Sequence, residues 1–356
     1  MNVRIRWAAL SLAGVALVGL TGCAGTASAS SPGSAAGAVE PLVLYAAEGF
    51  DAVTSKAFTA KTGIPVKLVD DSTGPLLTKI QAEKNNPQWS MLWVDGDTAF
   101  SSLDQQGLLA HYAAQGSWNA VGKAIIPSDK SYTPTGTTVM SALIYNAAKI
   151  TTVPATYRDL LGSAYTGKVG MNDPAQSGPT YPFIAGLMNQ LGGQAGGVSA
   201  GEAYLTKLKA NGLKVFPTNG DTLHALETGQ VDYGMIQSSA AIGEVLKVKA
   251  TANFQPKIVY MPKSTLLPSV IGIDKGASKV QQAEAKKFID FVVSPAGQAV
   301  MLTGDATGDS LFWPVVDNAT SLKNLPAFPT AYQSIDPAFW GPLQSQVVTW
   351  FDSNIK

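Results

Sequence analysis

Residues 42–69, LVLYAAEGFDAVTSKAFTAKTGIPVKLV, decide the fold of this chain. The apolar run 42–45 predicts a buried strand. Residues 50–62 then carry apolar side chains at helical spacing and end at Gly63. Residues 65–69 predict a second strand. A strand, a helix and a strand in this order are typical of a mostly parallel α/β sheet.

The same alternation continues along the chain and predicts two lobes. Two extended segments, 139–145 and 257–262, are interpreted as crossovers between a discontinuous first lobe and an inserted second lobe. The predicted boundaries are 41–138 with 263–318 for lobe 1, 139–262 for lobe 2 and 319–356 for a C-terminal helical arm. The expected architecture is two mixed sheets flanked by helices, with a cleft between the lobes.

The N-terminal residues predict export and a lipid anchor. Arg4 and Arg6 precede an apolar run that ends in Leu20-Thr21-Gly22-Cys23, and this tetrad resembles a lipobox. The resemblance implies a signal peptide over 1–22, lipidation of Cys23, a flexible tether over 23–40 and an extracytoplasmic protein held at the membrane. The alternative is an ordinary signal peptide with a chance cysteine.

Composition excludes several classes of function. Basic and acidic residues balance at 25 each, and no basic stripe predicts nucleic-acid binding. The chain has two histidines and one cysteine, with no zinc-ligand spacing and no phosphate-binding glycine motif. We therefore expect a binding protein with no metal and no cofactor, not an enzyme, and a monomer.

Seven segments in order resemble the extracellular solute-binding proteins of ABC importers, with the type 2 periplasmic-binding-protein fold. Their sequences are similar to the branch that binds ferric iron, 2-aminoethylphosphonate or thiamine. The segments are residues 42–48, 58–66, 93–97, 157–174, 177–178, 227–234 and 288–298. The resemblance implies capture of a small solute and its delivery to an ABC permease.

One departure from this family bears on the cargo. Iron-binding members carry two adjacent tyrosines after the segment that ends here at Gly234, whereas this chain continues with Met235 and Ile236. The resemblance therefore favours a 2-aminoethylphosphonate-like phosphonate or an organophosphate over ferric iron. Thiamine and polyamine cargoes stay open, as does a sensor that presents its ligand to a receptor.

The candidate ligand-binding residues follow predicted strands or open predicted helices. Ligands in open α/β sheets bind at the carboxyl ends of strands, where helix N-termini attract anions. Hydroxyls and amides there suit an oxyanion, while carboxylates suit an amine at the other end of the ligand. The alternative role for these polar residues is local helix capping. The candidates are Tyr45, Ala47, Glu48, Ser72, Thr73, Asp95, Asp97, Ser177, Gly178, Thr180, Asn219, Gln237 and Ser238.

Overall fold

The computed structural model describes residues 39–150 and 152–356. The expected signal peptide, Cys23 and most of the expected tether lie outside these residues. None of the described helices combines the length and the apolarity that a membrane crossing requires.

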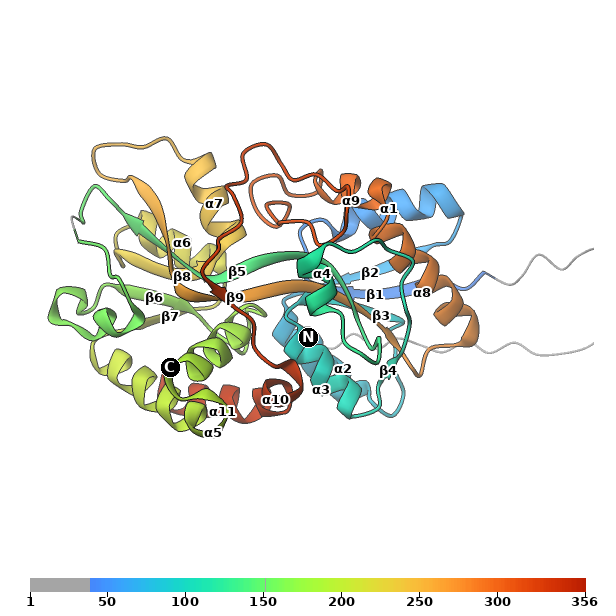
Figure 1. Ribbon diagram of the computed structural model, residues 1–356, viewed down its shortest axis with the longest axis horizontal. Helices are drawn as coiled ribbons and strands as arrows, with labels where there is room; N and C mark the ends of the chain where they lie inside the picture. Colours follow the sequence, from blue (N-terminus) through green and yellow to red (C-terminus); the bar gives the residue numbers. More distant parts are fainter. Residues whose placement is uncertain (1–38, 151) are drawn as a thin grey trace, which may run out of the picture. The chain divides into compact units, whose positions relative to one another are not determined.

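Within the described residues, ten strands pair into one sheet, and its main path runs β2-β1-β3-β9-β5-β8-β6-β7 (Figure 1). The short strands β4 and β10 both pair with β9. The strands are β1 (Leu42–Ala46), β2 (Val66–Asp70), β3 (Met91–Asp95), β4 (Leu109–Ala110), β5 (Thr133–Asn146), β6 (Val169–Asn172), β7 (Lys214–Phe216), β8 (Tyr233–Gln237), β9 (Pro256–Asp274) and β10 (Tyr332–Gln333).

We call β2, β1 and β3 with their helices the first half, and β8, β6 and β7 with theirs the second half. The α-helices are α1 (Asp51–Thr62), α2 (Thr73–Glu83), α3 (Asp97–Gln105), α4 (Ala120–Ile125), α5 (Thr180–Ala210), α6 (Asn219–Glu227), α7 (Ser238–Lys247), α8 (Lys279–Val292), α9 (Pro295–Met301), α10 (Pro337–Trp340) and α11 (Gln344–Asn354). Three 3-10 helices, η1 (Tyr157–Leu161), η2 (Ser163–Tyr165) and η3 (Gly341–Leu343), complete the described elements.

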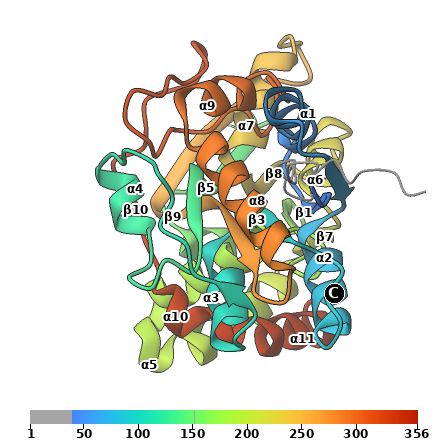
Figure 2. The ribbon, with the colours of Figure 1, turned by 90° about the vertical axis from the view of Figure 1, so that its right-hand side faces the viewer.

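Helices cover both faces of each half, as the sequence predicted for an α/β fold. Figure 2 looks onto the first half and shows α8 lying across its strands. In the second half, α6 and α7 lie on one side of the strands and α5 on the other (Figure 1). The C-terminal arm contacts both halves, because α10 packs on α3 and α11 packs on α5.

The long strands β5 and β9 run through both halves and join them into one sheet. The sequence predicted two sheets, but hydrogen bonding is continuous because these two strands cross without a break in the chain. Their pairing is irregular at the crossing, where Met140 pairs with Thr265 and Ala142 pairs with Tyr260. The sheet therefore changes register close to the predicted lobe boundaries.

Aromatic packing holds the first half together. The ring of Phe58 on α1 meets the ring of Phe288 on α8 at 5.0 Å between centroids. Trp93 on β3 lies 6.0 Å from Phe288 and is fully buried. α1 ends at Gly63, whose φ of 75° lies in the left-handed region that glycine adopts without strain. These contacts fix α1 against α8 and the sheet.

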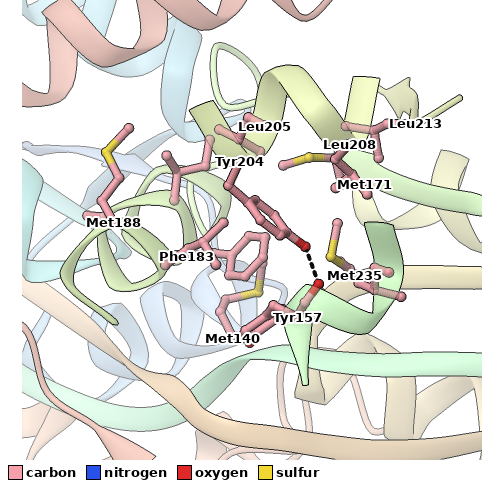
Figure 3. Close-up of a cluster of buried hydrophobic side chains, with 14 of the residues drawn as sticks. Met140, Tyr157, Met171, Phe183, Met188, Tyr204, Leu205, Leu208, Leu213 and Met235 are labelled. Carbon is pink, nitrogen blue, oxygen red and sulfur yellow. Dashed lines mark hydrogen bonds between the residues drawn. The ribbon is translucent and has the colours of Figure 1, made fainter. Parts of the chain in front are cut away.

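The second half has its own apolar core between α5 and the sheet (Figure 3). Phe183 on α5 packs 5.8 Å from Tyr157 of η1. The hydroxyl of Tyr204 donates to the backbone oxygen of Tyr157 at 2.6 Å, so this buried polar group is satisfied. Met171 on β6 and Met235 on β8 contribute to this core from the sheet.

α2 and α3 begin soon after the strands that precede them. β2 ends at Asp70 and α2 begins at Thr73, while β3 ends at Asp95 and α3 begins at Asp97. Thr73 and Asp97 therefore lie in the first turns of these helices. α5 kinks at Gly193, which has φ 65° and ψ −165°.

Candidate functional site

A cavity of about 160 Å³ lies between the two halves. From the first half it is lined by Ala47, Ser72, Thr73, Asp95 and Asp309. The second half contributes Gln176, Ser177, Gly178, Pro179, Thr218, Asn219, Gly220 and Gln237. We call this space the solute pocket. A more open cavity of about 540 Å³ shares Ala47, Ser72 and Asp309 with it.

Strand ends and helix starts place these residues. β1 and β3 run parallel and end side by side, so Ala47 and Asp95 reach the same edge of the sheet. β8 ends at Gln237 in the second half. α2 and α6 begin at the pocket, with Ser72 and Thr218 at their N-cap positions. The pocket is therefore formed by strand ends and helix N-termini of both halves.

The first half presents a group of acids, which we call the acidic side: Glu48, Asp95 and Asp309. Glu48 and Asp95 are 4% and 7% exposed, which is unusual for carboxylates without a basic partner. Ser269 donates to Glu48 at 2.6 Å, and the backbone N–H of Gly49 donates to Asp309 at 2.9 Å. No lysine or arginine lines either cavity among the described residues.

Burial and mutual repulsion raise the pKa values of these acids. Burial, followed by the charge of Asp95, raises the pKa of Glu48 well above its usual range. Burial and the charge of Asp309 raise the pKa of Asp95 in the same direction. Burial raises the pKa of Asp309 to about 6 and that of Asp51 to about 7. The acidic side thus lacks a positive charge that a bound cation would supply.

The second half presents a network of amides and hydroxyls, which we call the amide side. Asn172, buried at the end of β6, donates to Asn219 at 2.6 Å and to Ser177 at 3.2 Å. Thr222 donates to the Asn172 side-chain oxygen at 2.6 Å, so both the nitrogen and the oxygen of this amide have hydrogen-bond partners. The side chain of Asn219 also lies 3.4 Å from that of Gln237. These bonds hold the polar atoms in fixed positions beside the N-terminus of α6.

The two halves touch across the pocket. The side-chain nitrogen of Gln237 donates to Asp95 at 2.8 Å, and the backbone N–H of Gly74 donates to the Gln176 carbonyl at 3.3 Å. A Cβ atom on Gly74 would lie 1.9 Å from the carbonyl oxygen of Ala175. The two halves are therefore in direct contact, and this contact requires a glycine at position 74.

Of the predicted site residues, nine lie at the two cavities: Ala47, Glu48, Ser72, Thr73, Asp95, Ser177, Gly178, Asn219 and Gln237. The other four lie elsewhere. Tyr45 packs in the core with its hydroxyl donating to Glu83 at 2.9 Å, and Asp97 faces a different cavity at the start of α3. Thr180 is buried without lining either cavity, and the Ser238 hydroxyl accepts from the backbone N–H of Val139 at 3.1 Å.

Sequence reasoning missed two residues that shape the site. Asp309 lies in the loop after α9, and no strand or helix pattern links that loop to the pocket. Asn172 was read only as part of a family segment, although a buried asparagine at a strand end is a signal for a polar network.

The family model for bacterial extracellular solute-binding proteins matches residues 54–330. This chain belongs to that family. The family implies that this solute-binding protein binds a small molecule outside the cytoplasm and delivers it to an ABC permease. Its relatives are binding proteins, in agreement with a role without catalysis.

Individual relatives differ in their named cargo. A putative 2-aminoethylphosphonate-binding periplasmic protein of Salmonella typhimurium is 27% identical over 243 residues, which cover 68% of each chain. An Fe(3+)-binding periplasmic protein of Serratia marcescens is 24% identical over 293 residues, covering 76% of this chain and 79% of its own. The solute-binding protein is thus similar to members with unlike ligands.

Solved structures confirm the predicted two-lobed fold. The periplasmic binding protein AfuA from Actinobacillus pleuropneumoniae, solved with fructose-6-phosphate, superposes with a TM-score of 0.73 at 20% identity. The match covers 88% of the solute-binding protein and 98% of AfuA. Iron-bound HitA from Pseudomonas aeruginosa gives a TM-score of 0.70 at 22% identity. At these identities the likeness concerns the fold alone.

Proposed function

We propose that this solute-binding protein captures a small zwitterion with an ammonium group at one end and a phosphonate or phosphate group at the other. The observation that carries the proposal is the contrast across the pocket. Asp95 and Asp309 face it from one half without a basic partner among the described residues, while Ser177, Asn219 and Gln237 face it from the other. 2-Aminoethylphosphonate, named for the Salmonella relative, has this charge pattern.

The ammonium group would lie on the acidic side. Ionised Glu48 and Asp95 repel each other in the free protein, and a cation between them removes that repulsion. The anionic end would lie on the amide side, where the N-terminus of α6 supplies backbone N–H groups and a positive dipole end. A pocket without arginine fits an anion held by hydroxyls and amides.

Closure would couple binding to transport. Ligand that touches both halves favours the closed arrangement by its differential affinity for that state. We propose that the halves correspond to the predicted lobes and move about β5 and β9, near the register change between Met140 and Ala142. The closed form would then dock on the permease.

A purely cationic solute such as a polyamine is the second candidate. It is favoured by the open cavity beside the pocket, which is lined by Glu48, Asp51, Asp70, Asp71 and Asp309. A ferric site has less support, because no tyrosine lines either cavity among the described residues and phenolate is absent as a ligand.

A thermal-shift panel tests the cargo. It compares 2-aminoethylphosphonate, methylphosphonate, phosphate, spermidine, thiamine and ferric citrate on the purified protein. A ligand at 100 times its Kd adds about 2.7 kcal/mol to the free energy of unfolding, which raises Tm measurably. We expect the largest shift with 2-aminoethylphosphonate. A larger shift with spermidine would replace the zwitterion by a polyamine, and one with ferric citrate would overturn both.

We also propose that Cys23 carries a lipid that anchors the protein outside the cytoplasmic membrane. The support is the tetrad 20–23 at the end of the apolar N-terminal run. Expressed in a bacterium, the wild-type protein should partition into detergent with a mass that includes a diacylglycerol. Cys23→Ser should stay in the aqueous phase. Equal partitioning of both would contradict the anchor.

A further inference from the structure

A second group of charged side chains lies in the first half, apart from the solute pocket. Asp104 is in the last turn of α3, His111 follows β4, and Asp129 precedes β5. The Nε2 atom of His111 lies 2.7 Å from Oδ1 of Asp104. One ligand atom from each of the three residues lies within 4.8 Å of the other two. Three separate segments therefore bring an imidazole and two carboxylates to one point.

The surroundings of this group are negative and accessible. Among the described residues, the ion pair of Asp104 is with His111, and no lysine or arginine pairs with Asp129. The carboxylates of Asp104 and Asp129 border a cavity of about 320 Å³, which shares no lining residue with the solute pocket. Burial, and then the charges of Asp97, Asp129 and Asp336, raise the pKa of Tyr132 beside them.

We propose that Asp104, His111 and Asp129 together bind one divalent transition-metal ion, with Zn²⁺ preferred. Imidazole nitrogen and carboxylate oxygen are both zinc ligands, and a histidine disfavours Mg²⁺ and Ca²⁺, which take oxygen ligands. Three protein ligands leave a coordination position that water from the adjoining cavity fills. The ion would replace the contact between His111 and Asp104 by a bond to each.

The site would act on the segment between α3 and β5. Residues 106–132 hold only the short β4 and the six-residue α4 as regular structure. An ion bound by Asp104 and Asp129 ties both ends of this segment to α3, and any ligand that binds the folded state alone raises its stability. Metal binding would therefore be a structural feature of the first half, independent of the solute.

Isothermal titration of the purified, EDTA-dialysed protein with Zn²⁺ tests the site. We expect one ion per chain and a rise in Tm with added zinc. His111→Ala should weaken zinc binding by at least about tenfold. Loss of a residue that only orients a metal ligand already lowers metal affinity by about 10- to 100-fold, and loss of the ligand itself should cost at least as much. Asp129→Asn should weaken it in the same direction.

The chain offers a matched control, because it has only one other histidine. His224 is exposed on α6, and its Nδ1 lies 3.9 Å from a single acid, Glu227. His224→Ala should bind zinc as the wild type does. The proposal is overturned if the wild type binds no zinc, if His111→Ala binds it unchanged, or if Ca²⁺ binds more tightly than Zn²⁺. Equal Tm of the zinc-free variants will show that all of them fold.

Discussion

The two sides of the solute pocket differ in how their polar groups are satisfied. On the amide side, Asn172, Asn219 and Thr222 bond one another, so the network is complete without a ligand. On the acidic side, Glu48 and Asp95 are buried near each other, and no positive charge from the described part of the chain lies in the pocket beside them. The comparison teaches that the amide side is preorganised to orient a ligand, whereas the acidic side gains most from a ligand's charge.

The largest expected effect comes from removing a charge on the acidic side. Asp95→Asn keeps the shape of the side chain and can still contact Gln237. Truncating one partner of a buried charge pair costs several kcal/mol, so the affinity for 2-aminoethylphosphonate should fall by about 100-fold or more. Isothermal titration of both proteins measures this change.

The matched ligand for this variant is methylphosphonate, which lacks the amine. Its affinity should change far less in Asp95→Asn, because it places no cation on the acidic side. An equal loss for both ligands would mean that Asp95 acts through closure or packing. It would contradict the proposal that the ammonium group binds on the acidic side and the anionic group on the amide side.

The next effect concerns the contact between the two halves beside the pocket. Gly74→Ala would place a Cβ 1.9 Å from the carbonyl oxygen of Ala175 in the second half, beside the pocket. Backbone atoms cannot move aside as a flexible side chain does, so the closed arrangement should be disfavoured and affinity should fall by about tenfold or more. Titration with 2-aminoethylphosphonate measures the loss.

Gly196→Ala is the control for this substitution. Gly196 lies on α5, and an added Cβ meets nothing within 4 Å. It should bind as the wild type does. If Gly74→Ala also binds normally while remaining folded, the contact between Gly74 and Gln176 has no part in closure.

A smaller effect is expected from pH, to which the acidic side, its neighbour Asp51 and other acids with raised pKa values such as Asp97 and Glu244 all contribute. Folded-state pKa values of about 6 for Asp309 and about 7 for Asp51 lie above the usual value of 3.8. Between pH 4 and 7 the folded protein therefore holds more protons than the unfolded chain. Its free energy of unfolding falls as pH rises through this window. The ligand-free protein should have a Tm several degrees higher at pH 5 than at pH 8.

Affinity should follow the opposite trend. Binding of an ammonium group favours ionised carboxylates, so affinity for 2-aminoethylphosphonate should rise from pH 5 to pH 8. Titration across this range tests it, with methylphosphonate reporting the part that is due to the anionic end. Asp95→Asn should flatten both trends. A ligand-free Tm that rises with pH would contradict the proposed state of these acids.

The sequence predicted much of this site because of where strands end. Ala47 and Asp95 follow or end the neighbouring parallel strands β1 and β3, whose carboxyl ends meet at one edge. Gln237 ends β8, which approaches the pocket from the second half. Tyr45 was placed wrongly for a related reason. It is one residue inside β1, and its side chain points into the core, where it stacks on Trp89.

Other residues could not be found from local patterns. Asp309 reaches the pocket by accepting from Gly49, which lies 260 positions away in the chain. Only the folded arrangement brings these two loops together. Asp97 was predicted at the pocket but lies elsewhere for a local reason, because α3 begins at this residue and Asp97 lines the cavity that Asp104 also borders. Asp95 at the end of β3 thus lines the pocket, whereas Asp97 at the start of α3 does not.

The smallest effect probes the amide side at the start of α6. Thr218 and Asp221 form a capping box, in which the Thr218 hydroxyl accepts from the Asp221 N–H and Asp221 accepts from the Thr218 N–H at 3.0 Å. Thr218→Ala should lower the free energy of unfolding by about 1 kcal/mol and weaken both phosphonates equally, because the helix start orients the anion. Thr218→Ser keeps the hydroxyl and should restore both properties in chemical denaturation and titration. If Thr218→Ala weakened only the amine-bearing ligand, α6 would contact the ammonium end, and the two sides of the pocket would have to be exchanged.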